Sequence, residues 1–502
     1  MQIVIDRQSK VPLYRQIVDR VRELILSGAL PEGFRLPPER RLAEALGINR
    51  STVLTAYREL KGQGLVDSHV GRGTSVRAPA APAASDGGTT GLPWRQLFCE
   101  RALRVQEPVV RDLLELTERR DVISLAVGLP APELLPLELL REIFVRLVED
   151  VGPPMLLHCP TEGHTPLRET LSRWLATRGM RCSPAEVLVL SGSQQGLDLV
   201  VRALVDPGDV VVVEEPTYVG MLPVLRGAQA RVVGVPVDED GMRTDLLATV
   251  LEHQRPKLIY TLPTFQNPSG AEMALRRRRE LLELAARHRV PVLEDDPYSE
   301  LRYDGSPVPS LKALDRNGQV IYLSTVSKLL FPGLRLGLLV APRPVVRQLA
   351  LLKQGSDLHA SSVGQLLLDR FLSDGHYEPY LRRLRVAYSQ RRDAMDAALE
   401  AGKAMGVRWK RPRGGFYYWC RLPDGVERSR LLAAASDVGV AFLPGEACFF
   451  EPPEQAYLRL NFSYPSPTQI RDGVGRLLEA VRRSIRVEHR PPAEAVGMPP
   501  VV

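Results

Sequence analysis

Apolar residues near the start of the chain recur at the spacing of an amphipathic helix, and they are Leu13, Ile17, Val21, Leu24 and Ile25. This spacing predicts a helix over residues 12–28. A shorter helix is predicted over residues 38–46, with Pro38 at its start and Gly47 just after its end. A third helix is predicted from Ser51. Two short helices joined by a glycine-containing turn form a helix-turn-helix, whose second helix meets base edges in the major groove of DNA.

A different pattern fills the middle of the chain, where seven short apolar segments alternate with helical ones. The segments are 187–190, 210–213, 231–235, 258–261, 292–294, 320–324 and 336–340. Strands separated by crossover helices predict a mainly parallel sheet of seven strands with helices on both faces. In such folds ligands bind beyond the carboxyl ends of the strands. The polar residues that follow these segments are therefore the candidate site.

Residues 78–93 separate the two patterned regions and contain almost no large apolar side chain. Such a segment cannot bury a core, so it is predicted to be a flexible linker with an end-to-end distance of roughly 20 to 25 Å. The linker divides a DNA-binding domain over residues 1–77 from a larger domain over residues 94–485. The tail over residues 486–502, which contains two Pro-Pro pairs, is predicted to be disordered.

Charge is distributed unevenly along the chain. The net charge is +7 over 502 residues, yet residues 1–77 alone hold thirteen Lys and Arg against eight Asp and Glu. This excess fits a polyanion partner, although a solvated basic face would have the same composition. There is no run long enough to span a membrane and no signal-peptide pattern, so we expect a cytoplasmic protein.

Five cysteines without CxxC or Cys/His spacing predict neither a disulfide framework nor a zinc site, and we expect no bound metal. We expect them to be reduced thiols that pack as small hydrophobic side chains.

A lysine among hydroxyl side chains follows the segment 320–324. Thr325 and Ser327 precede Lys328, and Arg335 comes seven residues after it. A lysine amine condenses with an aldehyde, while hydroxyls and a guanidinium are suitable partners for a phosphate. The combination predicts a site for pyridoxal 5'-phosphate. Taken alone, Lys328 could be a surface lysine.

Further candidates also follow predicted strands. Ser193 and Gln194 lie in a small polar turn that opens a helix, where free N–H groups bind phosphate. Tyr218 could stack on a pyridine ring, and Asn267 could hydrogen-bond a phenolic oxygen. Asp295 could keep a pyridine nitrogen protonated. Taken singly, each has an ordinary explanation as a helix start, a core aromatic, a turn residue or a helix cap.

Residues 10–77 resemble the GntR family of bacterial regulators. The resemblance rests on the segments 36–40, 42–43, 47–53 and 71–74, which read LPPER, LA, GINRSTV and GRGT. It implies a winged helix whose DNA contacts come from Arg40, Arg50, Ser51, Thr52, His69, Gly71 and Arg72. Leu54 departs from the pattern, because many family members carry a basic residue there. The alternative is a helical protein-interaction domain.

Residues 121–482 resemble fold-type I pyridoxal phosphate enzymes of the aminotransferase class. The resemblance implies that Lys328 forms the internal aldimine and that Asp295 pairs with the ring nitrogen. The other implied contacts are Asn267 and Tyr298 to the ring 3-oxygen, Tyr218 stacked on the ring, Ser193, Gln194, Thr325 and Arg335 to the phosphate, and Arg459 to a substrate carboxylate. His158 departs from the family pattern, because a tyrosine at this position usually reaches the phosphate bound by the neighbouring subunit. Histidine has a different reach, so the cofactor affinity and the catalytic turnover typical of the family are not implied for this chain.

A GntR-type winged helix joined to an aminotransferase-like domain is the arrangement of the MocR subfamily, which this chain resembles from end to end. The resemblance implies a head-to-tail homodimer that binds a double-stranded DNA operator. It also implies that the protein senses an amino compound by external aldimine formation. Two alternatives stay open. One is a working aminotransferase whose winged helix is secondary, and the other is a cofactor-free dimerisation scaffold.

Overall fold

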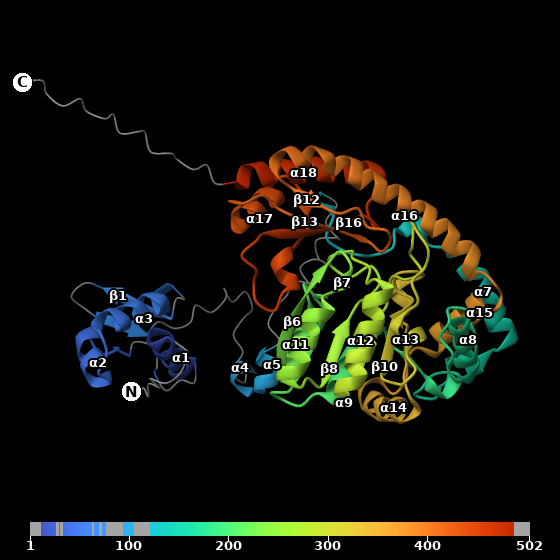
Figure 1. Cartoon of the computed structure of the whole chain (residues 1–502), viewed down its shortest axis with the longest axis horizontal. Helices are drawn as coiled ribbons and strands as arrows, with labels where there is room; N and C mark the ends of the chain where they lie inside the picture. The colour runs from blue at the N-terminus through green and yellow to red at the C-terminus, as the bar shows by residue number, and fades with distance from the viewer. Residues whose placement is uncertain are drawn as a thin grey trace, which may run out of the picture. The chain divides into compact units, whose positions relative to one another are not determined.

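The computed structural model describes residues 12–26, 30, 34–62, 65–69, 73–76, 94–104 and 121–485. The chain divides into two compact units, residues 1–99 and residues 100–502 (Figure 1). The predicted linker and tail lie outside the described residues. None of the helices described is both long enough and apolar enough to cross a membrane.

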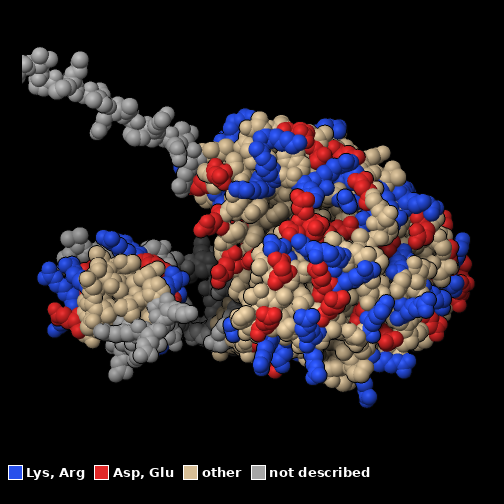
Figure 2. Space-filling view, viewed as in Figure 1, with Lys and Arg blue, Asp and Glu red and all other residues tan. Residues whose placement is uncertain are grey.

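The N-terminal unit contains the three predicted helices and a hairpin. They are α1 (Leu13–Leu26), α2 (Glu39–Leu46), α3 (Arg50–Gly62) and the antiparallel strands β1 (Val66–His69) and β2 (Gly73–Val76). Ile17 and Val21 of α1 are buried in one cluster with Val53 and Leu60 of α3, as their helical spacing predicts. In the view of Figure 2, several Lys and Arg side chains lie at the rim of this unit.

The turn between α2 and α3 depends on a glycine. Gly47 has a φ of 62° and a ψ of 36°, which is the left-handed conformation that ends many helices. Its N–H lies within hydrogen-bonding distance of the carbonyl groups of Ala43 and Glu44, which the helix would otherwise leave unpaired. This turn joins α2 to α3, and the two helices pack in one hydrophobic cluster, so the predicted helix-turn-helix is confirmed.

The second unit is built around an eight-stranded sheet. In spatial order its strands are β4 (Val187–Leu190), β11 (Gly337–Val340), β10 (Val320–Thr325), β9 (Val292–Asp295), β8 (Leu258–Thr261), β5 (Val210–Glu215), β6 (Arg231–Asp238) and β7 (Gly241–Met242). The strands from β10 to β6 are parallel, whereas β11 and β7 are antiparallel to their neighbours. All seven predicted strands are present. The prediction missed β7, because a two-residue strand in a hairpin has no apolar run.

Helices cover both faces of this sheet, and α11 and α12 lie on one of them (Figure 1). The helices of the two faces are α9 (Ser193–Leu204), α10 (Met221–Gly227), α11 (Thr244–Gln254), α12 (Leu275–His288), α13 (Leu311–Leu314) and α14 (Arg343–Asp357). Strand residues alternate between the two faces: Val211 and Val213 are buried with α9 and α14, whereas Val212 is buried with α11 and α12. Each such valine contributes roughly 1.5 to 3 kcal/mol by its burial.

The remaining elements are the strands of a smaller subdomain, a parallel strand pair and further helices. The strands are β3 (Ile123–Ser124), β12 (Arg408–Trp409), β13 (Tyr417–Arg421), β14 (Val440–Ala441), β15 (Leu443–Pro444) and β16 (Tyr457–Asn461). The α-helices are α4 (Trp94–Leu97), α5 (Glu100–Arg104), α7 (Leu137–Asp150), α8 (Thr165–Ala176), α15 (Ser362–Ser373), α16 (Tyr377–Leu399), α17 (Arg428–Asp437) and α18 (Pro467–Ser484). The 3-10 helices are η1 (Pro132–Leu134), η2 (Pro153–Leu156), η3 (Pro184–Glu186), η4 (Pro332–Leu334), η5 (Glu400–Met405) and η6 (Gly445–Cys448).

The smaller subdomain contains a four-stranded sheet in the order β12-β13-β16-β15, with antiparallel pairs throughout. The long helix α16 runs from beside α15 towards this sheet (Figure 1). Strands β3 and β14 pair in parallel, so the segment after β3 is tied to the smaller subdomain.

The five cysteines differ in how far they are buried. Cys420 and Cys448 are buried as small hydrophobic side chains, and Cys159 and Cys182 are half-buried. Cys99 is exposed, so the packing prediction is wrong for this residue. Its place between two short helices offers no core to fill. Within the described ranges, no group of three or more His, Cys, Asp or Glu residues could hold a metal ion.

Candidate functional site

Lys328 is the third residue after β10, at the carboxyl end of the parallel strands. Its side chain is partly buried, and Nζ donates a hydrogen bond of 2.7 Å to the carbonyl oxygen of Gly128. Burial lowers the pKa of Lys328 below its ordinary value; Arg459 and Arg335 lower it further, whereas Tyr417 and Asp295 oppose them. A lysine with a lowered pKa is more often neutral, and the neutral amine is the nucleophile that attacks a carbonyl.

Asp295 ends β9, the strand beside β10. The Tyr260 hydroxyl donates a 3.0 Å hydrogen bond to Oδ2, whereas Oδ1 is buried and has no hydrogen-bond partner among the residues described. Burial raises the pKa of Asp295 to about 7, against the hydrogen bond from Tyr260. A buried polar atom without a partner is uncommon. Oδ1 is therefore free to accept a hydrogen bond from a protonated ring nitrogen.

An anion site lies at the start of α9. Gly192 precedes this helix with a φ of +93°, and a Cβ atom on it would collide with Nη2 of Arg335. Ser193 and Gln194 are the first two residues of α9, so their N–H groups have no carbonyl partner within the helix. A guanidinium beside free N–H groups suits a phosphate.

Two predicted phosphate ligands use their side chains within the protein. The amide of Gln194 donates to the carbonyl oxygen of Gly220 at 2.7 Å, so its backbone N–H is the group left for a phosphate. The Thr325 hydroxyl donates to the carbonyl oxygen of Leu336 at 3.1 Å and receives a hydrogen bond from the N–H of Ser327. Thr325 therefore fixes the shape of the Lys328 loop.

The predicted carboxylate ligand contacts another predicted site residue. Nη1 of Arg459 donates to Oδ1 of Asn267 at 2.8 Å, and Nη2 donates to the carbonyl oxygen of Ala126 at 2.9 Å. Nε is buried and has no partner in the described part of the chain. The Tyr298 hydroxyl lies 3.3 Å from that of Tyr417, to which it donates. These contacts join loops of the large sheet to β13 and β16 of the smaller subdomain.

Tyr218 lies after β5, and its hydroxyl is 3.5 Å from Oε1 of Gln194. Burial raises the pKa of Tyr218, with Asp295 adding to the shift, so the ring stays neutral. The structure thus gathers Lys328, Asp295 and Tyr218 near the start of α9. A neutral aromatic ring, an unpaired carboxylate oxygen and an anion cradle together fit pyridoxal 5'-phosphate.

His158 lies apart from these contacts, beside a second histidine. Its Nδ1 is 2.8 Å from Nε2 of His359, and the two rings meet edge to face with centroids 5.1 Å apart. The predicted contact of His158 to a neighbouring subunit's phosphate stays a prediction.

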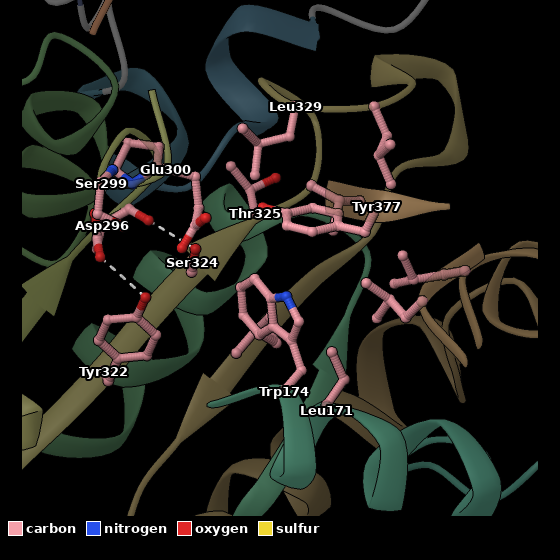
Figure 3. Close-up of a pocket in the computed structure, with 16 residues that line it drawn as sticks. Leu171, Trp174, Asp296, Ser299, Glu300, Tyr322, Ser324, Thr325, Leu329 and Tyr377 are labelled. Carbon is pink, nitrogen blue, oxygen red and sulfur yellow. Dashed lines mark hydrogen bonds between the residues drawn. The ribbon is translucent and has the colours of Figure 1, made fainter. Parts of the chain in front are cut away.

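A small cavity is lined by residues that lie on both sides of Lys328 in the chain, such as Ser324 and Leu329 (Figure 3). Thr325 is the one predicted site residue that lines it, together with apolar residues of α8 and α15. On its wall the Tyr322 hydroxyl donates to Oδ2 of Asp296 at 3.0 Å, and the Ser324 hydroxyl donates to the carbonyl oxygen of Asp296 at 2.6 Å. These bonds hold the end of β10 in place. The loop that carries Lys328 begins at this end of the strand.

Sequence reasoning missed three residues of the site, Tyr260, Gly128 and Tyr417. Tyr260 carried a weak signal, since it places a phenolic hydroxyl near the end of the mainly apolar strand β8. Gly128 and Tyr417 carried none, because their importance comes from contacts between distant parts of the chain.

The predicted DNA contacts lie at the start of α3 and on α2. Arg40 and Ser51 are exposed, and the Arg50 side chain is 53% exposed with Nη2 3.1 Å from Oε2 of Glu39. Thr52 is half-buried on the next position of α3. His69 ends β1, but its side chain lies outside the described residues, as do Gly71 and Arg72. The structure therefore places the predicted DNA-contacting residues of α2 and α3 close together. The DNA contacts predicted for the wing stay predictions.

Two family models match the chain. Residues 120–477 match the aminotransferase class I and II family, and residues 13–76 match the gntR family of bacterial regulatory proteins. The chain is 32% identical over 482 residues to the probable rhizopine catabolism regulatory protein MocR of Rhizobium meliloti, and the match covers 95% of each protein.

Two solved aminotransferases are similar to the larger unit. The kynurenine aminotransferase of Pyrococcus horikoshii has a TM-score of 0.75 and 40% identity over 79% of this chain and 99% of its own. LysN, the α-aminoadipate aminotransferase of Thermus thermophilus, has a TM-score of 0.73 and 37% identity over 78% of this chain and 98% of its own. The MocR match spans both units, so this chain belongs to the MocR-type family, in which a GntR helix-turn-helix domain precedes an aminotransferase class I and II domain.

Proposed function

We propose that this protein is a pyridoxal phosphate-dependent transcriptional regulator, which senses an amino compound and binds an operator in double-stranded DNA. One observation carries the proposal. A single chain presents an exposed Arg50 at the start of a GntR recognition helix and also gathers Lys328, Asp295 and Arg459 in a buried site. When bound, the cofactor supplies an aldehyde that condenses with primary amines. Operator binding also implies a cytoplasmic location.

The proposed roles of the site residues are those that the family resemblance implies, and the gathering of these residues in one site supports them. Lys328 holds the cofactor, and Asp295 accepts the proton of the ring nitrogen. Asn267 and Tyr298 face the ring oxygen, Tyr218 stacks on the ring, and the start of α9 with Arg335 binds the phosphate. Arg459 receives the carboxylate of the amino compound, because a guanidinium matches a carboxylate with two parallel hydrogen bonds.

Binding at Arg459 would reach the smaller subdomain directly. Arg459 lies on β16 and donates to the carbonyl oxygen of Ala126. The preceding residue, Leu125, donates to Ala441 and accepts from the N–H of Asn461, so this segment is bonded to both β14 and β16. A carboxylate that replaces the bond to Ala126 would therefore favour a different position of the smaller subdomain. Through such a shift, an effector would change how the DNA-binding domains are presented to the operator.

We also propose a head-to-tail homodimer, which an apolar surface beside His158 supports. Leu156, Leu157 and Leu358 are 73%, 64% and 54% exposed, and they flank the His158–His359 pair in the chain. Exposed leucines that cluster in this way usually mark a protein interface. A second copy of this chain is the proposed occupant, because it would bring His158 to a neighbouring phosphate.

Replacing both Leu156 and Leu157 with aspartate should convert the dimer to a monomer. Each buried leucine contributes roughly 1.5 to 3 kcal/mol, so the dissociation constant should rise by about a hundredfold or more. Sedimentation velocity over a concentration series measures this shift. Leu246→Asp, at an exposed leucine of α11, is the control and should leave the dimer intact. An unchanged dimer in the double variant would contradict this interface.

A working aminotransferase is the second candidate, since the predicted cofactor residues are present and the larger unit is 37% and 40% identical to two aminotransferases. The holoprotein should be mixed with a panel of amino acids and a keto acid acceptor. We expect an amino acid to change the visible absorbance and the operator affinity without sustained product formation. Many turnovers per site would favour the enzyme. A purified protein with no visible cofactor absorbance would instead favour the scaffold.

A further inference from the structure

Tyr417, the first residue of β13, lies in the middle of the site and has no role in the function proposed above. Its side chain is buried, and its ring packs under Arg459, whose Cζ is 4.1 Å from the ring centroid. The two residues project from the same face of neighbouring strands, because Trp419, two positions on, is the direct partner of Arg459. A guanidinium over an aromatic face is attracted by the ring electrons. Arg459 therefore fixes the plane of the Tyr417 ring.

The hydroxyl of Tyr417 is held against the backbone of Gly128. A Cβ atom on Gly128 would overlap this hydroxyl, so only glycine leaves it room. The carbonyl oxygen of the same Gly128 accepts the 2.7 Å hydrogen bond from Nζ of Lys328. One glycine thus touches both the tyrosine oxygen and the lysine nitrogen, and it places them side by side.

The electrostatic surroundings give the Tyr417 oxygen negative character. Tyr298 donates its hydroxyl proton to this oxygen over 3.3 Å. Burial alone would raise the pKa of Tyr417, but Arg459 and Lys328, together with the hydrogen bond from Tyr298, lower it below its ordinary value, while the nearby Cys448 opposes them. The pKa of Lys328 also depends on other charges, because Arg459 and Arg335 lower it and Asp295 raises it.

We propose that Tyr417 is a positioning residue whose hydroxyl oxygen stabilises the positive charge on the Lys328 nitrogen, with Arg459 and Gly128 fixing its place. The proposal rests on the function proposed above, because the charge on this nitrogen governs how readily an amino compound exchanges with Lys328. An acceptor beside a cation favours its charged form. Removal of the hydroxyl should therefore make the lysine nitrogen lose its proton at lower pH.

Tyr417→Phe tests this directly, because it keeps the ring that packs on Arg459 and removes only the oxygen. A pH titration of the visible absorbance of the holoprotein should show a midpoint that falls by about one pH unit. Gly128→Ala should lower the midpoint as well, since its methyl group would displace the hydroxyl. Tyr418→Phe is the matched control: the Tyr418 hydroxyl donates to the carbonyl oxygen of Arg392 at 3.0 Å, and its side chain points to the opposite face of β13.

A second measurement needs no cofactor. Acetic anhydride should acetylate Lys328 of the apoprotein with a pH profile that moves to lower pH in Tyr417→Phe, as peptide mass spectrometry can follow. A wild-type protein without visible absorbance would overturn the proposed cofactor, and the acetylation profile would still decide the role of Tyr417. Midpoints in Tyr417→Phe that equal those of Tyr418→Phe, or that rise, would overturn the proposal for Tyr417.

Discussion

Lys328→Ala should lose all covalently retained cofactor, and with it every response of operator binding to amino compounds. Lys328 is the amine at the carboxyl end of β10, and its lowered pKa favours the neutral nucleophile. Alanine leaves the start of α9 and Asp295 in place but removes the only group proposed to bond to the aldehyde. Reduction of the wild-type holoprotein with borohydride should leave a pyridoxyl adduct on the peptide that contains Lys328. The same treatment of the variant should leave none there.

Lys410→Ala is the matched control for this experiment, because Lys410 is an exposed lysine whose Nζ pairs with Glu239 at 2.7 Å. The control should retain the adduct and the visible absorbance. Operator binding without effector should be similar in wild type and both variants, since the DNA domain is a separate unit. An effector response that persists in Lys328→Ala would show that sensing does not pass through this lysine, and it would support the cofactor-free scaffold.

The strands of the large sheet were predictable because their burial on both faces makes them continuous apolar runs. Their ends were less predictable. The run at 210–213 predicts a strand that stops at Val213, yet β5 continues through Glu215. Glu214 is buried there because it accepts hydrogen bonds from the Thr261 hydroxyl at 2.6 Å and the N–H of Leu262 at 3.0 Å. A buried carboxylate of this kind looks like a turn residue in the sequence, since its partners lie on another strand.

In the site, too, some residues could be predicted from local sequence patterns and others could not. Asp295 and Lys328 could be found because one ends an apolar strand and the other lies shortly after one, where parallel sheets place their ligands. The packing of Tyr417 on Arg459 could not be found, because the two residues meet through the register of β13 and β16. The pairing of Arg459 with Asn267 likewise joins residues 192 positions apart. Local patterns indicate which residues are available, and the tertiary fold decides which of them touch.

Arg50→Ala should weaken operator binding by about ten- to a hundredfold, which corresponds to about 1 to 3 kcal/mol for a bidentate contact to a base. Arg50 opens α3, the helix proposed to enter the major groove, and more than half of its side chain is exposed. Nε and Nη2 lie 3.3 Å and 3.1 Å from Oε2 of Glu39, so α2 holds the guanidinium in one orientation before DNA arrives. Fluorescence anisotropy at a fixed salt concentration, with a duplex from the region upstream of the gene, measures the loss.

The decisive comparison is between this duplex and a random one of equal length. A residue that reads bases should lose much more affinity on the operator than on random DNA, whereas a residue that binds only phosphate should lose the same on both. Arg58→Ala, at an exposed position further along α3, is the matched control and should cost less operator affinity. Cofactor absorbance should be unchanged in both variants, because Lys328 lies in the other unit. Equal losses on the two duplexes would assign Arg50 to the backbone and move base recognition to Ser51, Thr52 or the wing.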